Sequence, residues 1–265
     1  MDVQLGEKGL ENVPGDVLNL LFPNHCYFCG VSLNTGVCIC SRCSSALEII
    51  QGTVCTRCGS PLVTGDVFHG KSCSQCSDLD FTFGRNESLG IFEGLLRKLI
   101  HLYKFEGRRS LYRLFATLLL THRRAFIMQH DLIVPVPLSP ARFAERGFNQ
   151  SFLIARAVAR HVRIACAGNG LCRRGNAAPL SSVPSHRERI SNLTDRISVR
   201  ESHIKRVENR QVLLIDDVLT TGATASACAE ALFKADAAKV NVLTLARSLK
   251  TSGALYLSGN RPIMK

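Results

Sequence analysis

Two adjacent acids, Asp216 and Asp217, stand between an apolar run and a turn of small residues. The four apolar residues before them, 212–215, are typical of a central parallel strand, and residues 225–235 are typical of a helix. The acids are therefore expected at the carboxyl end of a strand. Open α/β sheets bind ligands outside that end, where carboxylates can accept hydrogen bonds from sugar hydroxyls.

The turn after the acids has the composition of an anion-binding site. Its backbone amides lie at the N-terminus of the predicted helix, its hydroxyls are further donors, and Gly222 lets a phosphate approach the main chain closely. The alternative is an ordinary glycine turn after a strand that ends in solvated acids. We predict a ribose-phosphate site formed by Asp216, Asp217, Thr220, Thr221, Gly222, Ala223 and Thr224.

Nine of the twelve cysteines lie between Cys26 and Cys76, and eight of these nine form Cys-x-x-Cys pairs. Two residues between thiolates let a tight turn aim both sulfurs at one ion, and two such knuckles complete a tetrahedral zinc site. Gly30 and Gly59 each follow a knuckle, where a positive φ is useful. Sequential pairing predicts two structural zinc ribbons, with ligands Cys26, Cys29, Cys40 and Cys43 in the first and Cys55, Cys58, Cys73 and Cys76 in the second.

The alternatives for these cysteines are a disulfide framework and an iron-sulfur cluster. A disulfide framework is disfavoured because the N-terminus lacks the basic start and apolar core of a secretory signal. An iron-sulfur cluster ranks below zinc because the pairs repeat as regular knuckles and are not bunched in one run. No apolar run approaches the roughly 20 residues of a membrane span. We therefore expect a cytoplasmic protein without a membrane span.

Charge is distributed unevenly along the 265 residues. Residues 1–84 hold 4 Lys or Arg and 8 Asp or Glu, whereas residues 85–265 hold 29 and 13. The second part should attract polyanions, which include both nucleic acid and a pyrophosphorylated sugar, although a basic domain without such a partner is the alternative. The change predicts two domains, with an N-terminal helix and a double zinc ribbon in 1–84 and an α/β domain in 85–265.

Apolar periodicity supplies the remaining elements of the α/β domain. It predicts helices over residues 91–103 and 111–124, and strands over residues 132–137 and 240–246. A further helix follows Gln150, with an apolar face that includes Phe152, Leu153, Ala157 and Val158. Together with the strand before the acids, these elements predict a mainly parallel sheet flanked by helices.

The segment between strand 132–137 and the next helix carries Arg142 and Arg146. Arginines ahead of a helix N-terminus oppose its macrodipole, so their placement favours a bound anion. Val136, Pro137 and Arg146 are therefore candidates for a pyrophosphate-binding loop. The basic stretch 173–208 is either a mobile lid over that group or a solvated insertion.

Taken together, the chain resembles the ComF family over residues 14–247. The resemblance rests on Leu-Leu-Phe-Pro at 20–23 before the first knuckle, Tyr-Lys-Phe-x-Gly at 103–107, Val-Pro-Val-Pro at 134–137, Arg-Gly-Phe-Asn-Gln at 146–150, and the run from Asp216 to Thr224. The last run is similar to the phosphoribosyl pyrophosphate (PRPP) motif of type I phosphoribosyltransferases. The resemblance implies a double zinc ribbon joined to a phosphoribosyltransferase-like domain over 85–265.

The resemblance also implies a function in natural transformation. One interpretation is a PRPP- and Mg²⁺-binding protein that assists DNA uptake, with Asp216 and Asp217 as catalytic residues if it transfers a phosphoribosyl group to an acceptor that the sequence does not identify. The other is a non-catalytic accessory that binds single-stranded DNA or senses PRPP. Other DNA-uptake proteins are expected partners in both. A zinc-dependent interaction scaffold is a third interpretation.

Overall fold

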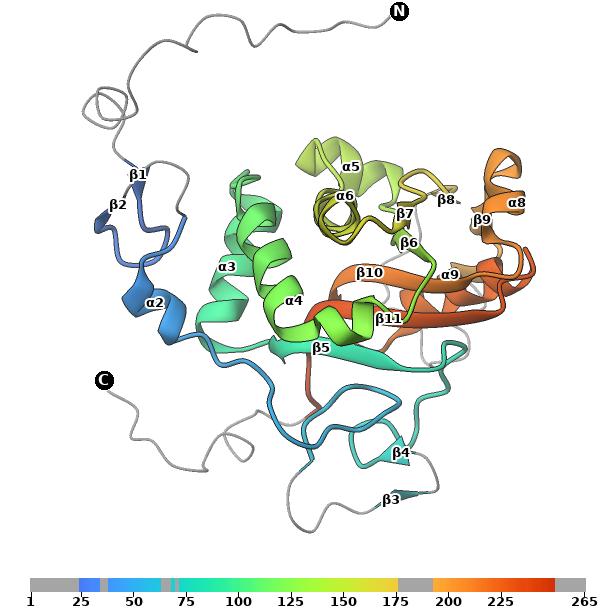
Figure 1. Ribbon diagram of the computed structural model, residues 1–265, viewed down its shortest axis with the longest axis horizontal. Helices are drawn as coiled ribbons and strands as arrows, with labels where there is room; N and C mark the ends of the chain where they lie inside the picture. The colour runs from blue at the N-terminus through green and yellow to red at the C-terminus, as the bar shows by residue number, and fades with distance from the viewer. Residues whose placement is uncertain (1–23, 34–37, 63–67, 70–71, 176–192, 251–265) are drawn as a thin grey trace, which may run out of the picture. The chain divides into compact units, whose positions relative to one another are not determined.

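The computed structural model describes residues 24–33, 38–62, 68–69, 72–175 and 193–250 (Figure 1). The chain divides into two compact units, Met1–Leu47 and Glu48–Lys265. The first group of four cysteines lies in the first unit, and the second group lies in the unit that contains the sheet. The domain boundary after Gly84 stays a prediction from composition. The helix expected ahead of the ribbons lies outside the described residues.

The first unit is built around two knuckles. Strands β1 (Asn24–His25) and β2 (Ser32–Leu33) pair antiparallel on either side of the first knuckle, and the short helix α2 (Ser41–Ser45) carries the second. The amide of Gly30 donates to the carbonyl of Cys26 at 2.9 Å, and Gly30 has φ +75°. The predicted use of a glycine in this turn is confirmed.

The second unit contains a five-stranded sheet in the order β5-β11-β10-β6-β7, in which every neighbouring pair is parallel. The predicted fold class, a mainly parallel sheet flanked by helices and preceded by four-cysteine ribbons, is confirmed. The central strand carries the two acids. The strands are β5 (Asn86–Ile91), β6 (Leu132–Pro135), β7 (Ala165–Cys166), β10 (Gln211–Leu219) and β11 (Lys239–Arg247).

Two further strand pairs lie outside this sheet, and both are antiparallel. Strand β3 (Phe68–His69) pairs with β4 (Ser72–Cys73) within the second ribbon. Strand β8 (Leu171–Arg173) pairs with β9 (Ile197–Val199), so Arg173, the first residue of the stretch predicted as a lid or an insertion, lies in a strand pair with residues further along that stretch. Residues 176–192 of that stretch lie outside the described residues.

Helices cover both faces of the sheet. Helices α4 and α6 contact strands on one side, and α9 contacts β10 and β11 from the other, where its alanines share a core with Val212, Leu214 and Val242 (Figure 1). The helices are α3 (Gly94–Phe105), α4 (Leu111–Ile127), α5 (Pro140–Arg146), α6 (Gln150–Val162), α8 (Ile204–Val207) and α9 (Ala223–Phe233), with a 3-10 turn at Glu201–His203.

Two elements differ from the periodicity analysis. The helix predicted over 91–103 begins at Gly94, because residues before it form the edge strand β5. Apolar periodicity does not detect β5 because two of its buried residues, Asn86 and Ser88, are polar. The hydroxyls of Ser88 and Thr244 lie 2.7 Å apart inside the protein. Helix α5 is the second difference, since residues predicted as a loop begin a helix at Pro140, capped by the Ser139 hydroxyl.

The buried face of α6 also differs from the prediction. Val158 is buried as expected, but Phe152, Leu153 and Ala157 are only partly buried. The buried side holds the small residues Ala155 and Ala159 together with Ile154 and Val162, which the predicted face did not include. The buried face of the helix is therefore rotated relative to the predicted one.

Candidate functional site

The two acids are the sixth and seventh of the nine residues of β10, and each has a partner from a different helix. One Asp216 oxygen, Oδ1, accepts hydrogen bonds from the Asp217 amide at 2.8 Å and from the Ser151 hydroxyl on α6 at 3.1 Å. The Asp217 carboxylate pairs with Nζ of Lys104 on α3 at 2.8 Å, and both side chains are largely buried. The sheet and two helices therefore fix both carboxylates.

Burial raises the pKa of Asp216 to about 7, and the neighbouring charge of Asp217 adds to the effect. The hydrogen bond from the Asp217 amide, the charge of Lys104 and the Ser151 hydroxyl act in the opposite direction. Near neutral pH the Asp216 carboxyl is therefore divided between its neutral and ionised forms. Groups that donate hydrogen bonds or bring positive charge to it would favour the ionised form.

The turn that follows β10 opens helix α9. Gly222 is the N-cap residue with φ +75°, a conformation that glycine adopts without steric cost. The first main-chain bond of the helix runs from the Ser226 amide to the Gly222 carbonyl, so the amides before Ser226 point out of the helix end. This geometry, with Thr221 and Thr224 beside it, is that of an anion-binding helix N-terminus.

The loop after β6 lies beside the acids. The amide of Val136 donates to the carbonyl of Ile215 at 3.0 Å, which places the loop next to the residue before Asp216. Asn149 holds the loop from the other end, since its Nδ2 donates to the Val136 carbonyl at 3.1 Å and its Oδ1 caps α6. Pro137 follows and lines a neighbouring cavity.

The guanidinium of Arg146 lies over the ring of Phe105, 4.9 Å from the ring centroid. Burial lowers the pKa of Arg146, while the charges of Asp217 and Asp216 oppose this change. The prediction that Arg146 opposes a helix macrodipole is wrong, because Arg146 lies in the last turn of α5, where the macrodipole favours a cation. Arg146 remains a candidate for anion binding because it lies near Asp216 and Asp217.

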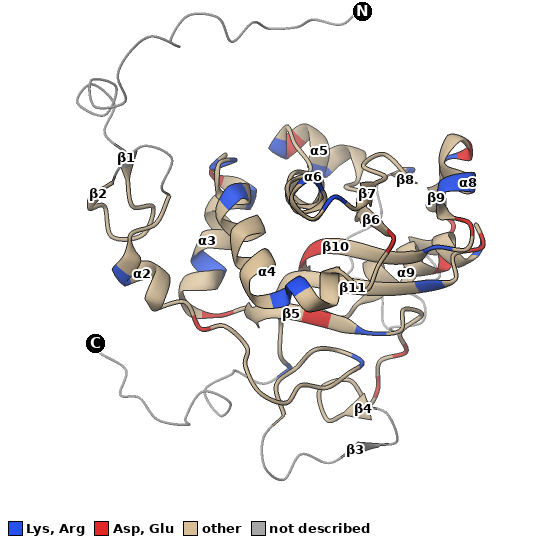
Figure 2. Cartoon of the chain, in the orientation of Figure 1, with Lys and Arg blue, Asp and Glu red and all other residues tan. Residues whose placement is uncertain are grey.

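A further arginine, Arg173 on β8, completes the positive surroundings of the acids. Burial lowers its pKa, and the nearby Arg142 acts in the same direction, whereas Asp216 opposes both. Within the described residues the Nε of Arg173 has no hydrogen-bond partner. Figure 2 shows basic residues on helices α3 to α6 and acidic residues on β10. Such a cluster of arginines around two carboxylates suits a ligand that carries both hydroxyls and phosphates.

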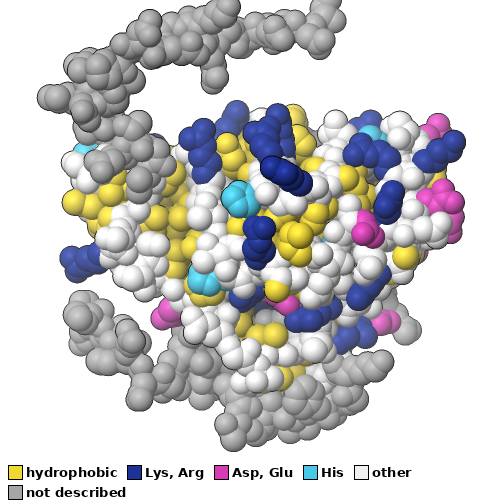
Figure 3. Space-filling model, viewed as in Figure 1, with side chains coloured by type: hydrophobic (Ala, Val, Ile, Leu, Met, Phe, Trp, Pro, Cys, Tyr) yellow, Lys and Arg dark blue, Asp and Glu magenta, His cyan; other side chains and the backbone are white. Residues whose placement is uncertain are grey.

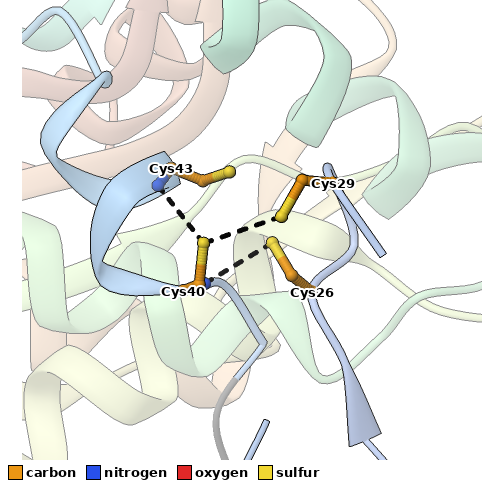
Figure 4. A group of neighbouring side chains, drawn as sticks. All are labelled: Cys26, Cys29, Cys40 and Cys43. Carbon is orange, nitrogen blue, oxygen red and sulfur yellow. Dashed lines mark hydrogen bonds between the residues drawn. The ribbon is translucent and has the colours of Figure 1, made fainter. Parts of the chain in front are cut away.

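The first four-cysteine group brings its sulfurs together. The side chains of Cys26, Cys29, Cys40 and Cys43 point toward one another, and their sulfurs all lie within 4.8 Å of each other (Figure 4). The amides of Cys40 and Cys43 donate to the sulfurs of Cys26 and Cys40, both at 3.4 Å. Four sulfurs about 2.3 Å from a central zinc ion would be separated by about 3.8 Å, so the group fits tetrahedral zinc.

The second four-cysteine group is buried and has the same geometry. Its sulfurs lie 3.9 Å apart for Cys55 and Cys76, and 3.7 Å apart for Cys58 and Cys73. Gly59 has φ +71°, as predicted for the residue after a knuckle. Both groups have the ligand set and spacing of structural zinc ribbons, and four protein ligands leave no open coordination position for a substrate.

The structure brings together most of the residues predicted for a ribose phosphate and adds two, Lys104 and Ser151, to which sequence reasoning gave no role. Arg173, from the stretch predicted as a lid or an insertion, also lies near the acids. The motif at 103–107 pointed to Lys104 only through the family resemblance, without a role. No local pattern distinguishes Lys104 from the other basic residues of α3, because its pairing with Asp217 spans more than a hundred residues.

Comparison with known proteins identifies the family. A model of the double zinc ribbon domain matches residues 17–77. The DNA utilization protein YhgH of Escherichia coli is 30% identical over 236 residues, which cover 87% of this chain and all of the relative. The chain belongs to the ComF family. ComFC, a competence protein of Bacillus subtilis, is 27% identical over 221 residues, which cover 79% of this chain and 84% of the relative.

Solved structures with partial likeness to this ComF-family chain include enzymes of phosphoribosyl chemistry. Adenine phosphoribosyltransferase from Leishmania donovani is 16% identical, with 61% of this chain and 83% of that chain covered, at a TM-score of 0.36. Glutamine PRPP amidotransferase from B. subtilis is 20% identical, with 52% and 26% covered, at 0.34. Within the described residues, the structure contains no helix of sufficient length and apolarity to span a membrane.

Proposed function

We propose that this ComF-family protein binds PRPP together with Mg²⁺ and assists DNA uptake in natural transformation, in the cytoplasm. The observation that carries the proposal is the pair Asp216 and Asp217 at the carboxyl end of a central parallel strand, followed by a turn that opens α9. The carboxylates would accept hydrogen bonds from the two ribose hydroxyls, and the turn at 220–224 would bind the 5′-phosphate through main-chain amides.

The pyrophosphate of PRPP would lie between the loop after β6 and the arginines. The Val136 loop is held by Asn149, and Arg146 and Arg173 supply positive charge that burial leaves poorly solvated. Mg²⁺ suits this donor set, since it is commonly held by one or two carboxylates together with phosphate oxygens, and when bound it would neutralise pyrophosphate charge. Asp216 and Asp217 would be its carboxylate ligands or would reach it through water.

If the protein transfers the phosphoribosyl group, the same residues would act on the reacting carbon. The C1′–pyrophosphate bond would loosen and leave positive charge on the ribose ring, close to the two carboxylates. Lys104 holds the Asp217 carboxylate in place and acts as a positioning residue. A cavity of about 660 Å³ lined by Pro137, Phe143, Phe148 and Arg173 adjoins the loop, and would give room to an aromatic acceptor.

Titration calorimetry of the zinc-loaded full chain with PRPP, with and without Mg²⁺, tests this proposal. The double variant Asp216→Asn/Asp217→Asn should lose binding, whereas Asp195→Asn, at an exposed acid outside the site, should retain it. Binding that is equal in all three proteins would place PRPP elsewhere and contradict the assignment. No binding by the folded wild-type protein would remove PRPP from the function.

A second candidate, a non-catalytic accessory that binds single-stranded DNA, is favoured by one surface. Arg156, Arg160, His161 and Arg163 line a cavity of about 660 Å³ together with Tyr112, between α4 and α6. Figure 3 shows further lysine and arginine side chains spread over one face of the molecule. Phosphates of a single strand would pair with the arginines, and a base would stack on the tyrosine.

The salt dependence of DNA affinity separates the two candidates. Arg156→Gln/Arg160→Gln should lower the slope of log affinity against log salt by about 0.7 for each phosphate that the arginines no longer neutralise. Lys205→Gln, at an exposed lysine on α8, is the matched control. A slope that the double variant leaves unchanged would exclude this surface as the DNA site.

A further inference from the structure

Arg247, the last residue of β11, is almost fully buried, with 1% of its surface exposed. One terminal nitrogen donates to the main-chain carbonyls of Leu219 at 2.9 Å, Thr220 at 2.5 Å and Ser248 at 2.6 Å. Within the described residues no carboxylate forms an ion pair with it. A buried guanidinium that binds main-chain oxygens fixes the path of the chain, here at the point where β10 passes into the phosphate-binding turn.

The segment after the second ribbon forms another link to the turn. Phe81 and Phe83 stack with ring centroids 4.7 Å apart, and a methyl group added at Gly222 would lie 2.5 Å from a Phe81 ring carbon. The Thr82 amide donates to the Ser226 hydroxyl in the first turn of α9 at 3.4 Å. The two rings, called here the phenylalanine floor, thus pack against Gly222 and the start of α9.

A third link comes from inside a knuckle. Gln75 lies between Cys73 and Cys76, is buried, and accepts a hydrogen bond from the Lys250 amide at 2.8 Å through its side-chain oxygen. Lys250 follows Arg247 by three residues, and the intervening Ser248 amide donates to the Leu219 carbonyl at 3.0 Å. One buried core therefore contains the four cysteines, both phenylalanines, Leu219 and Ala223.

We propose that the second four-cysteine site is a structural part of the phosphate-binding turn, and that Arg247 is the positioning residue that holds the start of that turn. This inference rests on the proposed function of the turn. Metal in the second site keeps the knuckles, the phenylalanine floor and Arg247 in place, so its loss disorders the turn. The first site lies in the other compact unit.

Calorimetry of the full chain with ribose 5-phosphate and, separately, with magnesium pyrophosphate tests Arg247. Arg247→Gln should weaken ribose 5-phosphate binding by about tenfold or more, which corresponds to a lost set of charged hydrogen bonds. Pyrophosphate binding should stay within about twofold, because the loop after β6 is untouched. Arg247→Lys should restore part of the loss, and Arg210→Gln, at an exposed arginine just before β10, is the control.

The results distinguish this inference from the proposed function. Retained ribose 5-phosphate affinity in folded Arg247→Gln, or equal loss of both probes, would overturn the inference and leave the proposed site intact. A wild-type protein that binds neither probe would overturn the proposed function, and the inference with it.

The coupling between the second metal site and the turn can also be measured on the wild-type protein, where the folding of a variant does not affect the result. Coupling between two sites is reciprocal, so ribose 5-phosphate should raise the zinc affinity of one of the two sites, as measured by equilibrium competition with a chelating dye. Cys29→Ser, which removes a ligand of the first site, should retain this increase, whereas Cys58→Ser should abolish it together with ribose 5-phosphate binding. Zinc affinities that are equal with and without the sugar phosphate would overturn the inference.

Discussion

Replacing Asp216 with asparagine is expected to stabilise the protein while abolishing PRPP binding. The folded protein holds the Asp216 carboxyl at a pKa of about 7, against the ordinary 3.8, chiefly because of burial. The unfolded chain therefore ionises first as the pH rises from 3.8, and the folded state becomes less stable until the pH passes about 7. Asparagine keeps an acceptor oxygen for the Asp217 amide and the Ser151 hydroxyl, and carries no charge.

The size of the gain follows from this difference in pKa. At about 1.4 kcal/mol for each pKa unit, the ionised carboxylate costs up to about 4 kcal/mol near pH 8. Partial access of solvent to the site reduces this figure, so we expect a gain of about 2 kcal/mol. For a unit of this size the gain corresponds to an increase in Tm of about 4–8 °C.

Thermal unfolding of the zinc-loaded wild type and of Asp216→Asn at about pH 8 and pH 5 measures the gain, with Asp195→Asn as the control. The increase should be largest at the higher pH and should fall to less than half of that value near pH 5, where the wild-type carboxyl is mostly protonated. A variant that is less stable than the wild type at pH 8, or a difference that is the same at both pH values, would refute the reasoning.

Three further changes have expected outcomes. Asp217→Asn should lower the free energy of unfolding by about 1–3 kcal/mol, because the ammonium of Lys104 loses its largely buried partner. Urea titration measures this change, and an unchanged midpoint of unfolding would contradict the pairing. Gly222→Ala should lower the free energy of unfolding by about 2–4 kcal/mol, because the φ of residue 222 is +75° and the new methyl group meets the ring of Phe81. A stable variant with normal PRPP affinity would show that the turn tolerates a side chain. A chelator should release two equivalents of zinc per chain and unfold both ribbons. Amide hydrogen exchange of the ribbon residues measures this unfolding. Protection from exchange that persists in the metal-free protein would count against structural zinc.

The features that the sequence predicts well are local. The strand, acids and turn from residue 212 to 224 are contiguous, and each Cys-x-x-Cys pair spans four residues, so one short pattern specifies each geometry. The zinc pairing also follows from order along the chain. The residues that were missed act across long separations, as in the pairing of Lys104 with Asp217 and of Arg247 with Leu219.

Burial of polar and small residues accounts for the other differences. Strand β5 is buried although Asn86 and Ser88 interrupt its apolar pattern, because each finds a hydrogen-bond partner inside the protein. Helix α6 buries Ala155 and Ala159 beside Ile154, whereas Phe152 is only partly buried, so its largest apolar side chain does not mark its buried face. A periodicity analysis predicts burial from hydropathy alone, whereas burial in the folded protein also depends on the size of a side chain and on the hydrogen-bond partners available to it.

The order of strands also sets when the sheet can assemble. Strand β5 is the first of the sheet to leave the ribosome, and its partner β11 is the last, with Asn86 paired to Val242. The central strand β10 likewise follows its neighbour β6 by about eighty residues. Because contacts of such long separation form slowly, β5 stays unpaired until almost the whole unit has been made, and this edge is where misfolding during synthesis is expected to begin.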